Sequence, residues 1–394
     1  MPNTAAPDTP VRVLIGNDHL GYGDALHGVG RYLLNITTSF DRSRVHPVPV
    51  ILRPEPRLSK FFEERGIEVR CLGRSKNDPR ALTDLVRIIR EERIEVVHVQ
   101  AFKSDTLGRI AGRITGVPTI LHGRDRIAER NLPMLVLDRL LGPQTKHALA
   151  VSETVRQYLH RERYIPMENI DVFYHGVDLS VFAGDRPGDR ERVRAEYSLE
   201  DGAVVAGTSI RLHPSKGHCY LLDGVAEVVK THPEFHLLIA NEGPEEAALR
   251  AQIERLGLNE NVTLTGSVKD VRAFLSALDI FVMPSLSEGF PNSMLEAMAM
   301  SRPIVATSVD GMGEMLTDGE NALVVPAADG AALGEALLRL CGDEELRGAL
   351  SAASLEFAEN LSIERTVERL TEIYYRVARS KQAARAGEAV RASR

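Results

Sequence analysis

The chain has 394 residues, 43% hydrophobic and 26% charged, a composition typical of a soluble globular protein with about two domains. The net charge of −7, the absence of tryptophan and the lack of a basic stripe argue against nucleic-acid binding. The three widely spaced cysteines argue against a disulfide framework and a zinc site, and no apolar run reaches the roughly 18 residues of a membrane-spanning helix.

Residues 1–10 lack both a basic start and an apolar core, so we expect a flexible tail there and not a signal peptide. Beyond them, short apolar runs alternate with helical patterns. Strands are predicted at 11–16, 45–52, 67–72, 95–99, 117–121, 147–151 and 170–173. Helices are predicted at 31–40, 57–65, 79–92, 104–113, 132–141 and 152–160. This alternation predicts a doubly wound parallel sheet in a first domain, residues 11–180.

A polar stretch at 182–194 is the predicted interdomain linker. The second domain, residues 181–360, repeats the alternation, with strands at 204–210, 236–240, 262–264, 280–283, 303–306 and 322–325. Its helices are predicted at 217–231, 245–256, 271–277, 293–300 and 313–316. Three further helices, 331–340, 344–357 and 363–380, follow without a strand. We expect the segment 361–380 to cross back to the first domain, and 381–394 to be a disordered tail.

Charge is divided unevenly along the chain. Residues 1–180 carry 26 Lys and Arg against 22 Asp and Glu, whereas residues 181–394 carry 22 against 33. The net charges are therefore +4 and −11. A basic first half would suit an anionic acceptor or a membrane surface. Free drift of surface charge between domains is an equally open explanation.

The richest stretch, residues 279–311, reads as strand, polar loop, helix and strand. A loop that feeds a helix after a parallel strand is a natural anion site. Glu288 lies in this Ser/Gly/Pro loop, whose hydroxyls can donate hydrogen bonds to its carboxylate. Glu296 lies eight residues later in the helix. Its spacing from Ser293 equally fits a capping box, in which the glutamate bonds the helix start.

Three other segments also follow predicted strands. Arg211 and Lys216 stand at a helix start and can clamp a diphosphate, although two ordinary surface cations in a solvated loop are the alternative. Gly28 and Gly30 open a helix, but Leu33 stands at the third glycine position, so this is no dinucleotide fingerprint.

His122 follows the strand at 117–121 and could be a polar contact, although a lone histidine is more often structural. The other histidines, including His98 and His175, form no metal-ligand spacing.

The residues from Ser287 to Ala299 resemble the signature of the retaining glycosyltransferases of family 4, which have the GT-B fold of two facing Rossmann-like domains. The family's E-x7-E pair matches Glu288 and Glu296, and its Arg…Lys-Gly clamp matches Arg211 and Lys216. His175-Gly176-Val177-Asp178 resembles the family's Asn-Gly-Val-Asp turn with a histidine in place of asparagine.

The resemblance implies that a nucleotide-sugar donor is bound mainly by the second domain and an acceptor by the first. Glu296 would hold the ribose, Glu288 with the amides of Gly289 and Phe290 the sugar, and Arg211 with Lys216 the diphosphate. His122 would touch the transferred sugar. The remaining implied donor contacts are Asn292, the Gly28–Gly30 loop, and the base site at Gly266, Ser267 and Val268.

By this resemblance the protein would move a hexosyl unit from a nucleotide sugar to a glycan or lipid-linked saccharide. The motif does not specify the donor; we expect a UDP-sugar first and GDP-mannose second. The protein would act by same-face substitution, without a metal or other cofactor, in polysaccharide or cell-envelope synthesis. We expect a cytoplasmic protein with peripheral contact to an anionic membrane. A nucleotide-sugar 2-epimerase on the same fold and a non-catalytic nucleotide-binding protein are the alternatives.

Overall fold

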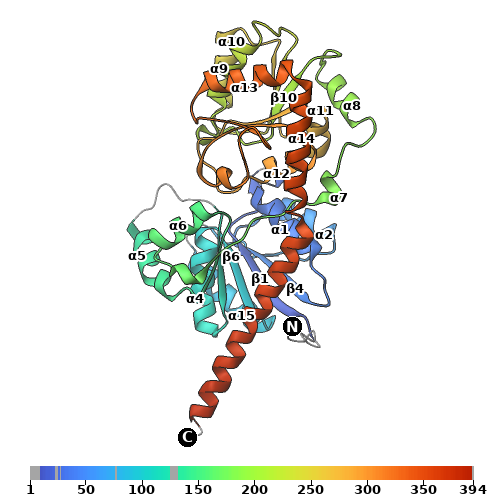
Figure 1. Ribbon diagram of the computed structural model, residues 1–394. Coiled ribbons are helices and arrows are strands. Elements are labelled where there is room, and N and C mark those ends of the chain that lie inside the picture. The colour runs from blue at the N-terminus through green and yellow to red at the C-terminus, as the bar shows by residue number, and fades with distance from the viewer. Residues whose placement is uncertain (1–8, 23–24, 27, 76–77, 125–131, 393–394) are drawn as a thin grey trace. The chain divides into compact units, whose positions relative to one another are not determined.

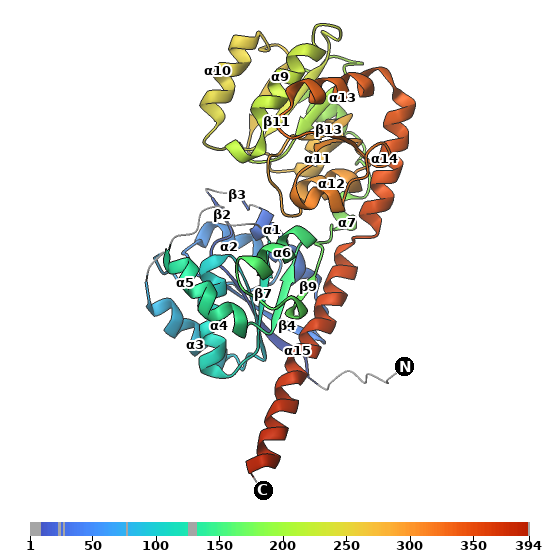
Figure 2. The same cartoon turned by 60° about the vertical axis from the view of Figure 1, so that its left-hand side comes forward.

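The computed structural model describes residues 9–22, 25–26, 28–75, 78–124 and 132–392 (Figure 1). The chain forms two compact units. The first consists of the chain up to His175 together with the segment from Ile363 onward, and the second is Gly176–Ser362. Each unit is built on its own parallel sheet, as Figure 2 shows from a second side.

The first unit holds a seven-stranded sheet in the order β5-β4-β1-β6-β7-β8-β9, and every neighbouring pair is parallel. The strands are β1 (Val11–Asn17), β4 (Val45–Ile51), β5 (Arg70–Cys71), β6 (Val96–Gln100), β7 (Thr119–Gly123), β8 (His147–Ala150) and β9 (Ile170–Val172). A small antiparallel pair, β2 (Gly21–Tyr22) and β3 (Ala25–Leu26), precedes the first helix.

The helices of this unit are α1 (Gly28–Ser39), α2 (Pro56–Glu63), α3 (Arg80–Glu91), α4 (Phe102–Thr115), α5 (Leu132–Leu141), α6 (Glu153–Arg161) and α15 (Ile363–Ala392). Two short 3₁₀ turns, η1 (Gly142–Gln144) and η2 (Met167–Asn169), precede β8 and β9. Both faces of the sheet are covered, as the burial of nearly every residue along its central strands requires. Val13 and Ile15 of β1 pack with α1 and α15 on one face, and Leu14 packs with α3 and α4 on the other.

The second unit holds a six-stranded parallel sheet in the order β12-β11-β10-β13-β14-β15. The strands are β10 (Val205–Thr208), β11 (His236–Ala240), β12 (Val262–Gly266), β13 (Ile280–Met283), β14 (Ile304–Thr307) and β15 (Leu323–Val325). The helices are α7 (Leu179–Phe182), α8 (Asp189–Glu196), α9 (His218–Val228), α10 (Glu246–Leu256), α11 (Val271–Ala277), α12 (Asn292–Ala299), α13 (Gly330–Gly342) and α14 (Glu344–Glu359). The 3₁₀ turns are η3 (Pro214–Lys216) and η4 (Asp310–Glu314), the latter where a helix was predicted.

The predicted α/β class, with two doubly wound Rossmann-like domains, is confirmed. The predicted linker at 182–194 is wrong, because this segment belongs to the second unit and includes most of α8. Val193 of α8 packs in a small cluster with Ala273 and Ala277 of α11. The helix escaped prediction because its sequence is almost wholly charged and it presents only one buried apolar side chain.

The closing helix α15 belongs to the first unit. Leu370, Tyr374 and Val377 lie in the same apolar core as β1 and α1. The helix runs to Ala392, past the predicted end at 380, through a segment rich in Ala, which favours helix. None of the helices in the described ranges is long and apolar enough to cross a membrane.

Candidate functional site

In the second unit, the loops that carry the predicted ligand-binding residues follow β10 and β13, the two central strands of the sheet. From β10 the chain proceeds outward to β11 and β12, whereas from β13 it proceeds to β14 and β15 on the other side. The boundary between β10 and β13 is therefore the switch point of the sheet, the place where open parallel sheets bind their ligands. Arg211 and Lys216 follow β10, and Glu288 follows β13.

Close backbone packing holds these two loops together. Gly217 has a φ of +65°, and a Cβ there would lie 2.1 Å from the carbonyl oxygen of Pro284. The amide of Leu286 also donates to the carbonyl of Ser215 over 2.8 Å. Only glycine fits this left-handed position against a neighbouring backbone. Lys216 is thus fixed beside the loop that carries Glu288.

The Lys216 ammonium donates to Oε1 of Glu288 over 2.6 Å. The hydroxyl of the buried Ser285 donates to the same oxygen, also over 2.6 Å, which confirms that loop hydroxyls serve this carboxylate. Both bonds fall on Oε1, so Oε2 retains its accepting capacity. Two residues 72 positions apart, predicted from separate motifs, therefore meet in one polar contact.

Glu296 lies on α12 and is buried. The capping-box interpretation of Glu296 is wrong, because α12 starts at Asn292 and its N-cap is Pro291, which makes no side-chain cap bond. Ser293 is thus already inside the helix, and the predicted reciprocal bonds have no place to form. The structure therefore excludes a capping role for Glu296.

The other predicted donor residues are spread along the same edge of the sheet. Gly289 and Phe290 are buried directly before α12, and Asn292 is its first residue. Arg211 is exposed just beyond β10. Gly266 ends β12 with a φ of +69°. Beyond Gly266, a cavity of about 320 Å³ is lined by Ser267, Val268, Thr265 and, from the α8 segment, Tyr197 and Arg192.

In the first unit, His122 of β7 belongs to a buried chain of hydrogen-bonding side chains. The Tyr374 hydroxyl lies 2.6 Å from Nδ1 of His98, and Nε2 of His98 lies 3.1 Å from Nδ1 of His122. Nε2 of His122 lies in turn 3.4 Å from Nε2 of His175. Tyr32 stacks on His175 with ring centroids 3.9 Å apart. His122 is therefore not a lone histidine.

Burial keeps the imidazoles of His98 and His122 neutral. It lowers the pKa of His98 to about 3 and that of His122 well below its usual 6.5, with the neighbouring histidines and Arg124 adding to the effect on His122. A neutral imidazole carries one N–H, so each link needs one donor and one acceptor. The direction of the Tyr374 hydroxyl thus sets which nitrogen of His122 carries its proton. His122 itself is 2% exposed.

The predicted glycine loop of the first unit divides into two roles. A Cβ on Gly30 would lie 2.1 Å from the carbonyl oxygen of Leu20, so close packing of α1 requires a glycine there. Gly28 is exposed, and nothing lies within 4 Å of a Cβ built on it. Packing therefore explains the glycine at Gly30, whereas no packing contact explains the glycine at Gly28.

Sequence reasoning missed Asp18, at the switch point of the first sheet between β1 and β6. Its carboxylate accepts from the amide of Ser104 over 2.6 Å and from that of Lys103 over 3.3 Å. Burial raises the pKa of Asp18, and these amide bonds oppose the rise. The predicted start of this helix at residue 104 is wrong, because α4 begins at Phe102. The sequence signal that could have identified Asp18 was an acidic residue placed directly after a predicted strand.

His98, His175 and Tyr374 were also missed as partners of His122, since the sequence gives no sign that separate elements bring them together. Among the described residues, no group of three or more His, Cys, Asp or Glu side chains could hold a metal ion. The metal independence expected from the resemblance is a separate prediction about the reaction.

Comparisons with known proteins agree with this geometry. The model described as Glycosyltransferase Family 4 matches residues 26–181, and the model described as Glycosyl transferases group 1 matches residues 200–343. The chain is 25% identical over 309 residues to the UDP-Gal:alpha-D-GlcNAc-diphosphoundecaprenol alpha-1,3-galactosyltransferase of Escherichia coli, covering 75% of this chain and 79% of that protein. It is 30% identical over 305 residues to the D-inositol 3-phosphate glycosyltransferase of Acidothermus cellulolyticus, covering 71% and 66%.

Among solved structures, Anabaena HepE in complex with UDP and glucose superposes with a TM-score of 0.82 at 19% identity, covering 92% of this chain and 99% of that one. A glycosyltransferase from Rickettsia africae gives a TM-score of 0.81 at 18% identity, covering 93% and 98%. These likenesses establish the fold. Together with the two family models, which match both halves of the chain, they confirm the resemblance carried by the segment around Glu288.

Proposed function

We propose that this chain, which belongs to glycosyltransferase family 4 and has the GT-B fold, transfers a hexosyl unit from a UDP-sugar to a glycan or lipid-linked saccharide with retention of configuration. The observation that carries this proposal is the Lys216–Glu288 contact at the switch point of the second sheet, with Arg211 on the same edge. A cation and a carboxylate side by side suit a ligand with both a charged diphosphate and a hydroxyl-rich sugar.

The cations would stabilise the leaving group. As the glycosidic bond to the diphosphate lengthens, negative charge grows on the leaving oxygen. Lys216, Arg211 and the amino end of α9, which begins at His218, are fixed before this charge appears and need little reorganisation. The acceptor hydroxyl then enters on the same face. No metal is assigned a part in this scheme.

The carboxylate would orient the sugar. Oε1 of Glu288 is held by Lys216 and Ser285, so Oε2 can accept from a sugar hydroxyl. Lys216 would share its donors between Glu288 and a phosphate oxygen, which couples the positions of sugar and diphosphate. The buried Glu296 would bind the ribose hydroxyls, and the cavity beside Ser267 and Val268 would take the base. Gly289, Phe290 and Asn292 would complete the sugar contacts.

The choice of donor and acceptor rests on the relatives. A galactosyltransferase relative is named for UDP-Gal and a diphosphoundecaprenol-linked acceptor, and HepE was solved with UDP and with UDP-glucose. GDP-mannose is the second candidate donor. The first unit would bind the acceptor, with His122 toward the transferred sugar and Gly28 toward the diphosphate. We place the protein in the cytoplasm, in cell-envelope polysaccharide synthesis.

The test measures turnover and nucleotide binding in Lys216→Ala and Arg211→Ala. Each should lower kcat by about 10²–10³ if it stabilises the leaving group. Lys230→Ala is the matched control, because Lys230 is an exposed cation of the same unit paired with Glu227. Saturating UDP should stabilise the wild type by a few kcal/mol in thermal unfolding, and GDP and ADP should not.

Retained turnover in both cation variants would refute the assignment. Conversion of the nucleotide sugar without any acceptor would instead indicate the 2-epimerase, and UDP binding without turnover across acceptors would indicate a binding protein. Glu296→Gln should weaken UDP binding, since the charged acceptor for the ribose hydroxyls is lost while the side-chain volume is kept.

A further inference from the structure

The closing helix α15 contributes a buried hydroxyl to the series of side chains that ends at His122 and His175. Tyr374 of α15 contacts His98, and His98 contacts His122. In the described part of the chain, the polar atoms of Tyr374 and His98 have no partners outside this series. The direction in which hydrogen bonds are donated along it therefore depends only on its own members.

The Tyr374 hydroxyl must donate to His98. Burial raises the pKa of Tyr374 well above its usual 10, so the hydroxyl keeps its proton. Nδ1 of His98 lies 2.6 Å away and is the one acceptor available to it among the described residues. If His98 donated instead, the buried phenol proton would have no acceptor, which costs the free energy of an unmade hydrogen bond.

This donation determines the tautomers of both histidines. His98 accepts at Nδ1, so as a neutral imidazole it carries its single proton on Nε2. That N–H points to Nδ1 of His122, 3.1 Å away, and makes this nitrogen an acceptor. His122 is also neutral, because burial lowers its pKa. Its own proton is therefore on Nε2.

Packing keeps the His122 ring in this orientation. Tyr32 lies edge-on to it with ring centres 5.7 Å apart, and Phe173 does so at 5.9 Å. Close packing of buried rings opposes a half-turn of the imidazole. Nδ1 therefore stays toward His98, and the N–H at Nε2 stays on the side of His175.

The links become longer toward His175. The Tyr374–His98 distance is 2.6 Å, the His98–His122 distance 3.1 Å, and the distance between Nε2 of His122 and Nε2 of His175 is 3.4 Å. The last exceeds the roughly 2.7–3.2 Å typical of N–H hydrogen bonds. The proton of His122 is therefore held most weakly at the end of the series away from α15.

We propose that Tyr374 is a positioning residue for the transfer reaction: through His98 it holds His122 in the tautomer whose Nε2–H donates to an oxygen of the transferred sugar. The sugar oxygen would take the place of the long link to His175. This inference rests on the proposed function, in which His122 faces that sugar. It assigns α15 a part in the chemistry of the first unit, in addition to its part in the core.

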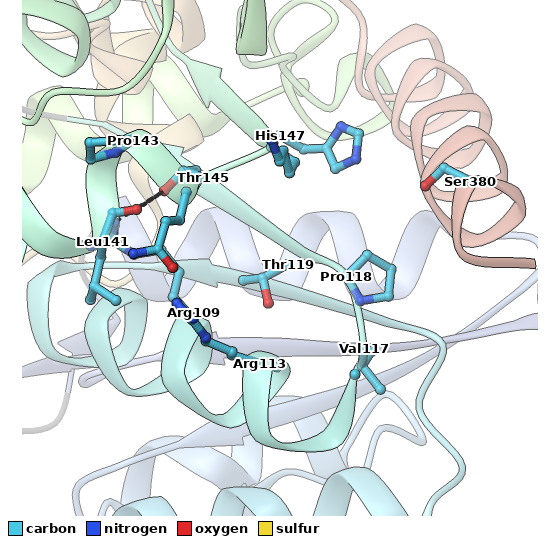
Figure 3. A pocket seen from close by; sticks show the side chains of 14 residues that line it. Arg109, Arg113, Val117, Pro118, Thr119, Leu141, Pro143, Thr145, His147 and Ser380 are labelled. Carbon is cyan, nitrogen blue, oxygen red and sulfur yellow. Dashed lines mark hydrogen bonds between the residues drawn. The ribbon is translucent and has the colours of Figure 1, made fainter. Parts of the chain in front are cut away.

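Helix α15 also offers a control hydroxyl away from this series. Ser380 lines a cavity of about 620 Å³, and Figure 3 shows it on α15 with His147 of β8 and Thr119 of β7. Both of those residues begin their strands, whereas His122 lies near the other end of β7. The Ser380 hydroxyl bonds only the Val377 carbonyl of its own helix. Ser380→Ala therefore removes a hydroxyl from α15 without affecting the histidines.

The test reads the proton position directly. In the full chain labelled with ¹⁵N in its histidine rings, long-range ¹H–¹⁵N correlations distinguish the two tautomers, and the signals lost in His122→Phe identify His122. The wild type and Ser380→Ala should show the Nε2–H form. Tyr374→Phe lets His98 donate at neither fixed nitrogen, and the Nδ1–H form of His122 should appear.

Turnover gives the second measurement, as UDP release from UDP-glucose and UDP-galactose with glycoside acceptors. Tyr374→Phe should lower kcat about tenfold, the effect of one lost hydrogen bond, and leave the KM for the UDP-sugar unchanged. Ser380→Ala should keep the wild-type kcat. In the His122→Phe background, Tyr374→Phe should lower kcat no further, because it acts only through His122.

An Nδ1–H tautomer in the wild type, or an unchanged tautomer or kcat in Tyr374→Phe, would overturn the inference. So would a further loss of kcat in the double variant, since Tyr374 would then act by another route. The wild-type spectrum tests the direction of donation even if a variant does not fold. Absence of wild-type turnover would instead refute the proposed transferase function, and the spectra, which need no turnover, distinguish the two failures.

Discussion

A single hydroxyl terminates the histidine chain of the first unit. Tyr374 is completely buried, and its hydroxyl is the partner of Nδ1 of His98. Tyr374→Phe removes this partner while keeping the ring, and leaves a buried imidazole nitrogen unsatisfied. We expect a loss of about 1–3 kcal/mol in the free energy of unfolding, measured with urea. The neighbouring Tyr375→Phe is the control, because the Tyr375 hydroxyl bonds a half-buried carbonyl of Arg44 and should cost about 1 kcal/mol or less. Equal losses of unfolding free energy in the two variants would contradict the proposed role of the Tyr374 hydroxyl in the histidine chain.

The buried histidines also predict how stability depends on pH. Burial, with Lys216 nearby, lowers the pKa of His218 to about 4, and burial lowers that of His98 to about 3. Above pH 6.5 these groups are neutral in both states, so they add no pH dependence. As the pH falls below 6.5, the unfolded chain binds protons that the folded chain does not, and stability falls until the folded pKa is reached.

Each such histidine should therefore contribute a slope of about 1.4 kcal/mol per pH unit between pH 6 and its folded pKa. Neither ring nitrogen of His218 has a hydrogen-bond partner in the described part of the chain, so His218→Leu should flatten the slope without breaking a bond. Urea titrations of wild type and His218→Leu between pH 5 and pH 8 measure the two slopes, and identical slopes would refute the prediction.

Among the elements, α8 shows most clearly what the sequence could not reveal. Most strands of the two parallel sheets were predictable because they are short apolar runs bounded by turn residues. The charged sequence of α8 instead resembles a linker, and its stability comes from a distant residue. Arg190 and Arg194 of α8 lie 2.5 Å and 2.6 Å from the carboxylate oxygens of Asp279, which also accepts from the amide of Val205. No local pattern encodes such a contact.

This gives a prediction for Asp279→Ala. Its removal leaves two arginines and one strand amide without their acceptor, and we expect a loss of about 2–4 kcal/mol, since hydrogen bonds to charged groups contribute about 1.5–3 kcal/mol each and are not additive. Asp185→Ala is the control, because Asp185 forms a more exposed pair with Arg302 and should cost under about 1 kcal/mol. Chemical denaturation of both variants checks this. A similar cost at the two sites would show that α8 is held by its apolar contacts alone.

The same limit applies to the candidate site. The positions of Arg211, Lys216 and Glu288 after parallel strands were predictable, because the carboxyl ends of such strands share one edge. Their direct contact was not, since spacing cannot show which loops a glycine such as Gly217 brings into backbone contact. Nor could it show that His122 contacts histidines from a neighbouring strand and from the segment before the second unit.

For the whole molecule, the route of the chain predicts which part can fold alone. The second unit is one continuous segment, Gly176–Ser362, with its own sheet and core, and its two ends are paired through the bond from the Val177 amide to the Leu361 carbonyl. The first unit is discontinuous and takes the buried Leu370 and Tyr374 from α15 into its core. A fragment of residues 176–362 should therefore fold cooperatively and retain UDP binding.

A fragment of residues 1–362 should behave differently. It keeps the second unit intact but removes α15, so the core that α15 shares with β1, β6, α1 and α2 loses this helix. We expect it to lose the unfolding transition of the first unit while the second unit still unfolds cooperatively and is still stabilised by UDP. Differential scanning calorimetry with and without UDP, compared with the full chain, measures both. A core stripped of one layer cannot bury enough apolar surface to offset the entropy of folding, so two intact transitions in the fragment 1–362 would contradict this prediction.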